Sequence, residues 1–252
     1  MSEGRQQYGL TVVTGAGGGI GSAVALRLAQ STDAVALIYR SKRPDTLIDR
    51  LSTRVVFAES WDLADYEAVS AGFARLAASA GSVKTLVHAA GPHVPMMHLS
   101  RVDPQSFGTQ MHQDVDSFFN LVHAALPALR RTSGSITAVT TAATTRFPVR
   151  DGLSSTPKGA VEALTRALAA EEGRFGVRAN CVGPGMLVDG MAARLIANGD
   201  LDQTALEIAR RNIPLRRFGS ASDIAEAVAF LASESANFVT GQKLDIDGGY
   251  GV

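Results

Sequence analysis

A glycine-rich turn near the start of the chain has the residue types that bind phosphate. Segment 14–21 has the spacing G-x-x-x-G-x-G and connects the apolar run 10–13 to an alanine- and leucine-rich stretch. The run predicts a buried strand and the stretch predicts a helix, so free N–H groups at the helix start would face an anion. Gly15 would permit a tight turn, Gly19 would let a pyrophosphate approach the backbone, and Gly21 would let helix and strand pack closely. The turn therefore predicts dinucleotide binding.

A basic loop follows the next predicted strand, 34–38. After Tyr39 come Arg40, Ser41, Lys42 and Arg43, with no carboxylate among them. In a dinucleotide-binding fold an acidic residue here would bind the ribose hydroxyls, whereas arginine suits a 2′-phosphate. The loop favours NADP over NAD; the alternative is a solvated loop that happens to be basic.

Strands and helices alternate along the rest of the chain. Further strands are predicted at 54–58, 85–88, 135–140, 177–182 and 244–246. Strands that alternate with helices predict an α/β fold, a Rossmann-type doubly wound parallel sheet of about seven strands with helices on both faces. Ligands of such sheets bind beyond the carboxyl ends of the strands, so the loops after residues 14, 39, 88, 140 and 182 should share one edge.

Several connecting segments carry their own predictions. Asp62 either caps the helix that ends near residue 80 or contacts an adenine. Asp103-Pro104 is typical of a helix start, and the helix it opens should run to about residue 130 with a packed apolar stripe. The segment 186–211 is predicted to be a mobile substrate lid.

The composition narrows the classes of function. The chain has 252 residues, 46% of them hydrophobic and 19% charged, which fits one dinucleotide-binding domain spanning 1–252. Lys+Arg and Asp+Glu both number 24, so no net field favours nucleic acid or an acidic membrane. The single cysteine excludes an internal disulfide and a cysteine-rich zinc site. A polar N-terminus and the lack of a long apolar run lead us to expect a cytoplasmic protein, and we expect no metal site.

The assembled motifs resemble the short-chain dehydrogenase/reductase family along essentially the whole chain. The resemblance rests on the glycine turn, Asp62-Leu63, Ala90-Gly91, Lys158-Gly159-Ala160, the segment 180–185 and the tail 240–249. It implies a nicotinamide cofactor, a small-molecule carbonyl or alcohol substrate, and a homodimer or homotetramer. The cofactor-binding residues that it implies are Gly15, Gly17, Gly19, Ile20, Gly21, Arg40, Ser41, Asp62, Leu63, Ala89, Ala90, Gly91, Lys158, Pro184, Gly185 and Leu187.

The resemblance also implies a catalytic set, from which this chain departs. In the family a tyrosine donates a proton to the carbonyl oxygen, and a lysine four positions later lowers the pKa of that tyrosine and holds the nicotinamide ribose. Here Lys158 is present but Ser154 stands at the tyrosine position; the family's serine falls on Thr141 and its asparagine on Asp114. Serine is far less acidic than tyrosine and its oxygen lies closer to the backbone. An ionised Asp114 could not donate a hydrogen bond.

Two further departures lie near this set. Thr156-Pro157 has the residue types of a helix start, which would leave Ser154 in the preceding loop. Asp189 stands where the family has a threonine. It could repel a cofactor phosphate or contact a substrate hydroxyl, or it is an exposed loop carboxylate.

Three hypotheses follow from the missing tyrosine. The first is a working reductase whose proton comes from a water held by Ser154 and Lys158, or from His93 or His98 in the loop after the fourth strand. The second is a catalytically weak or inactive cofactor-binding protein that acts as a partner or sensor. The third is a non-redox reaction on the same scaffold.

Overall fold

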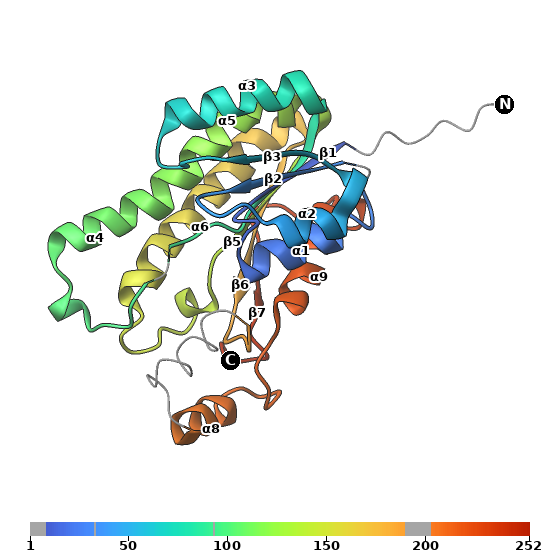
Figure 1. The fold of residues 1–252 in the computed structure, drawn as a ribbon. Helices are drawn as coiled ribbons and strands as arrows, with labels where there is room; N and C mark the ends of the chain where they lie inside the picture. The colour runs from blue at the N-terminus through green and yellow to red at the C-terminus, as the bar shows by residue number, and fades with distance from the viewer. Residues whose placement is uncertain (1–8, 33, 93, 190–202) are drawn as a thin grey trace.

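One parallel sheet organises the chain. The structure is a computed structural model that describes residues 9–32, 34–92, 94–189 and 203–252. Its seven strands lie in the order β3-β2-β1-β4-β5-β6-β7 (Figure 1). They are β1 Leu10–Thr14, β2 Val35–Tyr39, β3 Val55–Ser60, β4 Val83–His88, β5 Ser135–Val139, β6 Arg178–Pro184 and β7 Lys243–Ile246. Each predicted strand is present, with ends displaced by at most two residues.

Helices cover both faces of the sheet, which confirms the predicted α/β fold (Figure 1). The helices are α1 Gly19–Leu28, α2 Asp45–Leu51, α3 Tyr66–Ala80, α4 Pro104–Met111, α5 Ser117–Thr132, α6 Gly152–Glu172, α8 Gln203–Arg211 and α9 Ala221–Ala232. Helices α3, α5 and α6 pack on one face, and α1, α2 and α9 on the other.

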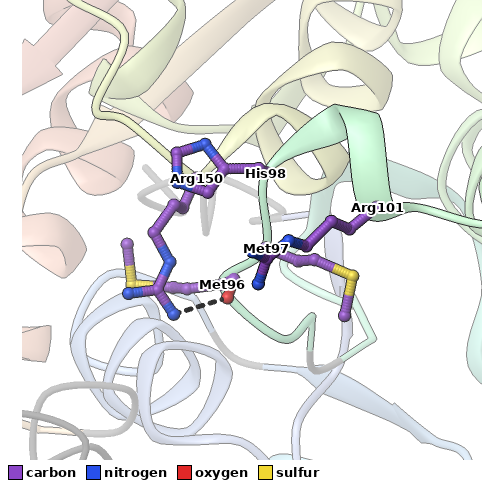
Figure 2. Close-up of a pocket in the computed structure, with 5 residues that line it drawn as sticks. All are labelled: Met96, Met97, His98, Arg101 and Arg150. Carbon is purple, nitrogen blue, oxygen red and sulfur yellow. Dashed lines mark hydrogen bonds between the residues drawn. The ribbon is translucent and has the colours of Figure 1, made fainter.

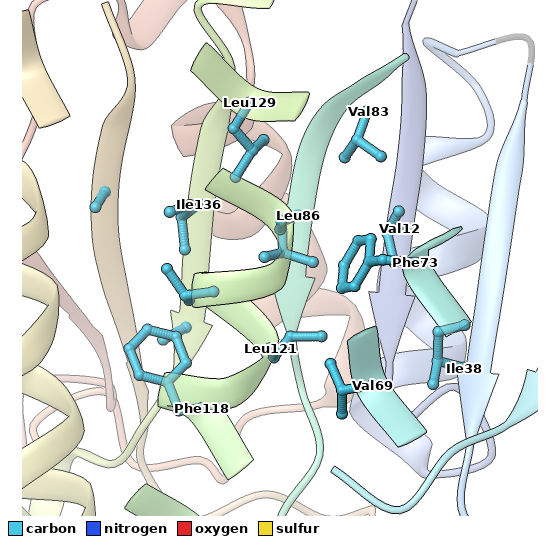
Figure 3. Packing of buried hydrophobic residues seen from close by; sticks show 14 of the residues in the cluster. Val12, Ile38, Val69, Phe73, Val83, Leu86, Phe118, Leu121, Leu129 and Ile136 are labelled. Atoms are coloured by element: carbon cyan, nitrogen blue, oxygen red, sulfur yellow. The ribbon is translucent and has the colours of Figure 1, made fainter. Parts of the chain in front are cut away.

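Alternation along the strands builds a core on each side of the sheet. In β1, Val12 faces the cluster under α3, α5 and α6, and Val13 faces the cluster under α1 and α9. Figure 3 shows the first cluster, where Phe73, Leu86 and Leu121 interdigitate between helices and strands. The central strands β1, β2 and β5 are buried almost throughout and are rich in apolar residues, which is why they could be recognised from sequence.

The predicted long helix contains a local distortion. Asp103 caps α4 by accepting a hydrogen bond from the Ser106 N–H at 3.0 Å, as expected. A π-helical turn, His112–Asp116, then joins α4 to α5, and it carries the buried Asp114. Turns of this kind are frequent at functional sites. The apolar stripe is only partly buried, since Phe118 is fully buried whereas Phe119 is exposed.

The prediction that a helix begins at Thr156-Pro157 is wrong. Helix α6 begins at Gly152, so Ser154 lies in its first turn rather than in a loop. Leu153, Pro157 and Val161 are buried at four-residue spacing, and this apolar face carries the helix past the proline. The Thr156 hydroxyl donates to the Gly152 carbonyl at 2.7 Å, which satisfies one backbone acceptor in this turn.

Two carboxylates that the sequence singled out make local hydrogen bonds. Asp62 does not cap α3; Asp65 does, by accepting from the N–H groups of Glu67 and Ala68. Asp62 instead accepts from the Ala64 N–H at 3.1 Å within the preceding turn. Asp189 accepts from the Ala221 N–H at 2.6 Å, so this loop carboxylate binds the start of α9. Most of the predicted lid, 190–202, lies outside the described residues; α8 forms its end.

Candidate functional site

The glycine turn is tight and touches the turn that follows β4. Gly15 has φ +70°, and a Cβ there would lie 2.5 Å from the Ala89 carbonyl oxygen. A Cβ on Gly21 would overlap the Gly15 carbonyl oxygen, whereas one on Gly19 would meet no atom within 4 Å. Gly15 and Gly21 are therefore required by packing, as predicted, and Gly19 borders open space.

The start of α1 has the donors that an anion requires. Its N-cap, Gly18, supplies no side-chain hydrogen bond, so the first backbone N–H groups, those of Gly19 and Ile20, keep their donors. The Ser22 hydroxyl donates to the Ala16 carbonyl at 2.7 Å and holds the turn in place. The open space at Gly19 and the free N–H groups together fit a pyrophosphate.

The strand order places this cradle at the natural ligand site of the sheet. Sequence order reverses between β1 and β4, whose carboxyl ends lie side by side. The Ala89 N–H donates to the Thr14 carbonyl at 3.3 Å, and Ala90 and Gly91 continue from there. A Cβ on Gly91 would lie 3.1 Å from Lys158 Nζ, so the β4 turn passes directly over that ammonium.

The basic loop after β2 lies against the glycine turn. A Cβ on Gly17 would lie 3.5 Å from the Lys42 carbonyl oxygen. Arg40 is exposed, and the Ser60 hydroxyl donates to its carbonyl oxygen. The segment that contains Arg40 and Ser41 therefore lies next to the glycine turn; a role of these two residues in binding phosphate stays a prediction.

The remaining predicted cofactor residues also reach this edge. Asn120 donates to the carbonyl of Leu63 at 3.1 Å, so α5 fixes the loop that also holds Asp62. Pro184 ends β6, and Gly185 donates its N–H to the Ile246 carbonyl at 3.0 Å. Leu187 pairs with Gly219 in an isolated parallel bridge.

Lys158 and Asp114 form a short ion pair behind the β4 turn. Lys158 Nζ lies 2.5 Å from Asp114 Oδ1, and the side chains are 14% and 1% exposed. Gln110 Nε2 donates to the other carboxylate oxygen at 2.7 Å. The sequence predicted Lys158 and Asp114 as members of the same site. It did not predict that they form an ion pair or that Gln110 hydrogen-bonds to Asp114.

A buried histidine borders the ion pair. His88 ends β4 and shares a 3.1 Å hydrogen bond with the Thr14 hydroxyl. Burial, reinforced by the positive charge of Lys158, lowers the pKa of His88 to about 3. His88 is therefore neutral at physiological pH.

Comparison with known proteins identifies the scaffold. Residues 15–251 match the family model described as enoyl-(acyl carrier protein) reductase. L-fucose dehydrogenase of Oryctolagus cuniculus is 31% identical over 99% of this chain and 87% of its own length. This chain belongs to the short-chain dehydrogenase/reductase family.

Other similar proteins match this chain over nearly its whole length, and solved structures share its fold. Galactitol 2-dehydrogenase (L-tagatose-forming) of Cereibacter sphaeroides is 35% identical over 95% of this chain and 94% of its own. Actinorhodin polyketide ketoreductase, solved with NADPH, superposes with a TM-score of 0.89 at 25% identity and covers 98% of both chains. A short-chain dehydrogenase/reductase from Mycobacterium ulcerans has the same TM-score, over 97% of this chain and 90% of its own.

The two hydroxyl residues of the family's catalytic set come from neighbouring elements. Thr141 follows β5, and its hydroxyl oxygen accepts from the Ala143 N–H at 3.1 Å, which leaves its hydrogen free to be donated. Ser154 is half-buried in the first turn of α6, one turn before Lys158. Serine extends one atom beyond Cβ, so its hydroxyl lies several Å short of where a tyrosine hydroxyl would be.

Some site residues were not predicted from sequence. Asp151 stands at the N-cap position of α6, without a side-chain capping hydrogen bond, three residues before Ser154 and seven before Lys158; that spacing could have drawn attention to it. Burial raises the pKa of Asp151 to about 6. Of the two histidines considered as proton donors, His98 is exposed in the loop after β4, and His93 lies outside the described residues.

The described residues contain neither a candidate metal site nor a candidate membrane-spanning helix. No group of three or more His, Cys, Asp or Glu side chains gathers there in a way that could hold a metal ion. Among the same residues, no helix combines the length and apolar character needed to cross a membrane.

Proposed function

We propose that this protein is an NADP(H)-dependent oxidoreductase that interconverts a carbonyl and an alcohol on a small or medium substrate, with an atypical proton donor. The observation that carries the proposal is the Lys158 ammonium, held by Asp114 at 2.5 Å directly behind the cofactor turn at Gly91. The relatives support the reaction class, because they are named as dehydrogenases and reductases. The ketoreductase solved with NADPH supports the cofactor.

The residues divide the work of reduction. A bound nicotinamide would supply a hydride to the carbonyl carbon, and the carbonyl oxygen would then need a proton. The Thr141 hydroxyl donates a hydrogen bond that orients this oxygen, and the Lys158 ammonium stabilises the negative charge that develops on it. The proton comes from a water held between the Ser154 hydroxyl and Lys158, and solvent restores it. Loss of the tyrosine acid costs rate, by about 10²–10⁴.

Cofactor preference tests the role of the basic loop. Arg40→Ala should weaken NADPH binding by about tenfold or more, because a charge-assisted hydrogen bond to the 2′-phosphate is lost. NADH binding should stay unchanged, as should both affinities in the control Arg50→Ala, an exposed arginine of α2. Nicotinamide fluorescence measures all of these affinities. Equal NADPH and NADH affinities in the unmodified protein would remove the NADP assignment.

Restoring the tyrosine tests the proton donor. Ser154→Tyr should raise the rate of ketone reduction by about 10²-fold or more, because the tyrosine would add the positioned acid that the proposed site lacks. Thr156→Tyr, an exposed position two residues along α6, is the matched control and should leave the rate unchanged. No gain in the Ser154 variant would mean that Thr141 and Lys158 do not form a site for carbonyl reduction.

We expect the enzyme to act as a homodimer or homotetramer, as the family resemblance implies. The two other hypotheses remain outcomes of these assays. Cofactor binding without turnover of any carbonyl would indicate a partner or sensor protein. Substrate conversion with no net change in nicotinamide absorbance would indicate a non-redox reaction.

A further inference from the structure

A cavity with a basic lining opens between two loops near the start of α6. Its volume is about 520 Å³, and it is lined by Met96, Met97, His98, Arg101 and Arg150. Figure 2 shows the Arg101 and Arg150 side chains approaching from opposite sides, with Met96 and Met97 between them. The lining therefore combines two guanidinium groups with polarizable thioethers.

The two loops belong to the catalytic edge of the sheet. One follows β4 and the cofactor turn, and the other follows β5 and leads into α6. The Met97 N–H donates to the Arg150 carbonyl at 2.8 Å, and Arg150 Nη2 donates to the Met96 carbonyl at 3.0 Å (Figure 2). Helix α6, whose first two turns carry Ser154 and Lys158, begins two residues after Arg150, and a Cβ on Gly152 would lie 2.7 Å from Leu99, the neighbour of the lining residue His98. The cavity therefore lies at the start of the helix that carries the proposed reaction site.

The backbone at Arg150 is held in an unusual conformation. Its φ is +77°, in the left-handed region that disfavours residues with a side chain. This conformation lets the Arg150 carbonyl accept from Met97 while its guanidinium reaches Met96 in the cavity wall. Costly conformations of this kind cluster at ligand-binding sites.

The arginines of the cavity have no acidic partner in the described part of the chain. No described carboxylate lies within 4.0 Å of either guanidinium, although nine other described arginine or lysine side chains form such pairs with Asp or Glu. The carboxyl nearest in sequence to Arg101 is that of Asp103, which accepts from the Ser106 N–H as the cap of α4. The one nearest to Arg150 is that of Asp151, whose pKa burial raises to about 6 with no cation offsetting it. The cavity thus keeps its positive charge available to a ligand.

We propose that this cavity binds an anionic group of the substrate, a carboxylate or a phosphate joined to the reacting carbonyl by a short apolar segment. The proposal rests on the proposed function, because it takes Lys158 and Thr141 as the carbonyl site. Arginine forks match the oxygens of both anions. Methionine side chains adapt to apolar segments of variable shape, and Met96 and Met97 lie where that segment would pass.

Binding of unreactive analogues tests the subsite without turnover. We would titrate the full chain, at saturating NADP⁺, with pentanoate, pentyl phosphate and the neutral pentanamide by calorimetry. At least one anion should bind about tenfold or more tightly than the amide, and the tighter anion identifies the source of the charge. Equal affinities for the amide and both anions, or no binding of any of the three, would overturn the proposal.

Single substitutions assign the binding to the cavity. Arg101→Met keeps an unbranched side chain but removes the guanidinium, and no hydrogen bond of the Arg101 side chain is found among the described residues, so the fold should be retained. The variant should lose about tenfold in anion affinity and nothing for pentanamide. The control Arg166→Met removes an exposed charge farther along α6 and should change neither. An equal loss in the control would assign the effect to overall charge and reject the cavity.

A kinetic comparison separates this proposal from the proposed function. Reduction of 4-oxopentanoate should have a kcat/KM about tenfold or more above that of 4-oxopentanamide, and Arg101→Met should abolish the difference. If neither ketone is reduced while pentanoate binds through Arg101, the proposed function fails and the subsite stands. If both are reduced equally and the anions bind no better than pentanamide, the subsite fails and the function stands.

Discussion

Lys158 and Asp114 carry opposite charges that are both largely removed from water. Only 1% of the Asp114 side chain and 14% of the Lys158 side chain are exposed. Removing one partner of such a pair leaves the other charge buried without compensation, which costs more than the pair itself contributes. Each residue therefore depends on the other for stability as well as for position.

Truncation of Asp114 should destabilise the protein strongly. We expect Asp114→Ala to lower the free energy of unfolding by about 3 kcal/mol, measured by urea denaturation. Asp114→Asn keeps the shape and one acceptor for Lys158, so its cost should be smaller. A loss below about 0.5 kcal/mol in the alanine variant, which is typical of a surface position, would show that the pair is not buried as described.

His88 makes the protein sensitive to mild acid. Its pKa is about 3 in the folded state and about 6.5 when unfolded, so between these values the unfolded state binds more protons. Stability is therefore lost as the pH falls from 6.5 toward 3, by about 2 kcal/mol at pH 5 from this residue.

The variant His88→Asn isolates this effect. Any packing cost of the substitution applies at both pH values, so the difference in unfolding free energy between pH 7 and pH 5 should shrink by about 2 kcal/mol. The exposed His112→Asn serves as the control. An undiminished difference in the His88 variant would mean that this imidazole can be protonated in the fold.

The sequence predicted which residues form the candidate site better than it predicted which side chains contact one another. Lys158, Thr141 and Ser154 follow from motifs, because a motif fixes which element a residue sits on. The Lys158–Asp114 contact depends on a π-helical turn, and the depressed pKa of His88 depends on packing from several elements. Neither has a local signature in the sequence.

The glycine turn allows packing and ligand binding to be separated. Gly21→Ala places a Cβ against the Gly15 carbonyl, so it should lower the melting temperature. Gly19→Ala meets no protein atom within 4 Å and should leave stability unchanged or slightly higher. It should nevertheless weaken NADPH binding by about tenfold, since the methyl group enters the space assigned to the pyrophosphate. Full NADPH affinity in the Gly19 variant would place the cofactor elsewhere.

Helices and strands could be predicted where the hydrophobic pattern and the capping residues indicated the same boundary. Strands buried on both faces gave unambiguous apolar runs, and Asp103-Pro104 marked the true start of α4. Helix α6 shows the opposite case: the Thr156-Pro157 pair suggested a boundary, but the buried face of Leu153, Pro157 and Val161 decided the outcome. Tertiary packing there outweighed a local capping signal.

For the whole molecule, the parallel sheet explains how distant segments form one site. All seven strands point the same way, so the turns after β1, β2, β4, β5 and β6 meet at one edge. This topology, and hence the location of the site, followed from the alternation of strands and helices. The proposed anion subsite did not, because the cavity at Arg101 and Arg150 depends on the conformation of two loops.

The most direct test of the account is to follow the hydride itself. NADPH carrying deuterium at both C4 positions would be incubated with 4-oxopentanoate, and the alcohol product analysed by mass spectrometry. We predict one deuterium on the carbinol carbon. In Lys158→Ala the yield of labelled alcohol should fall by about 10²-fold or more. No labelled alcohol despite bound NADPH, or conversion of the substrate without the label, would contradict the assignment of this protein as a carbonyl reductase.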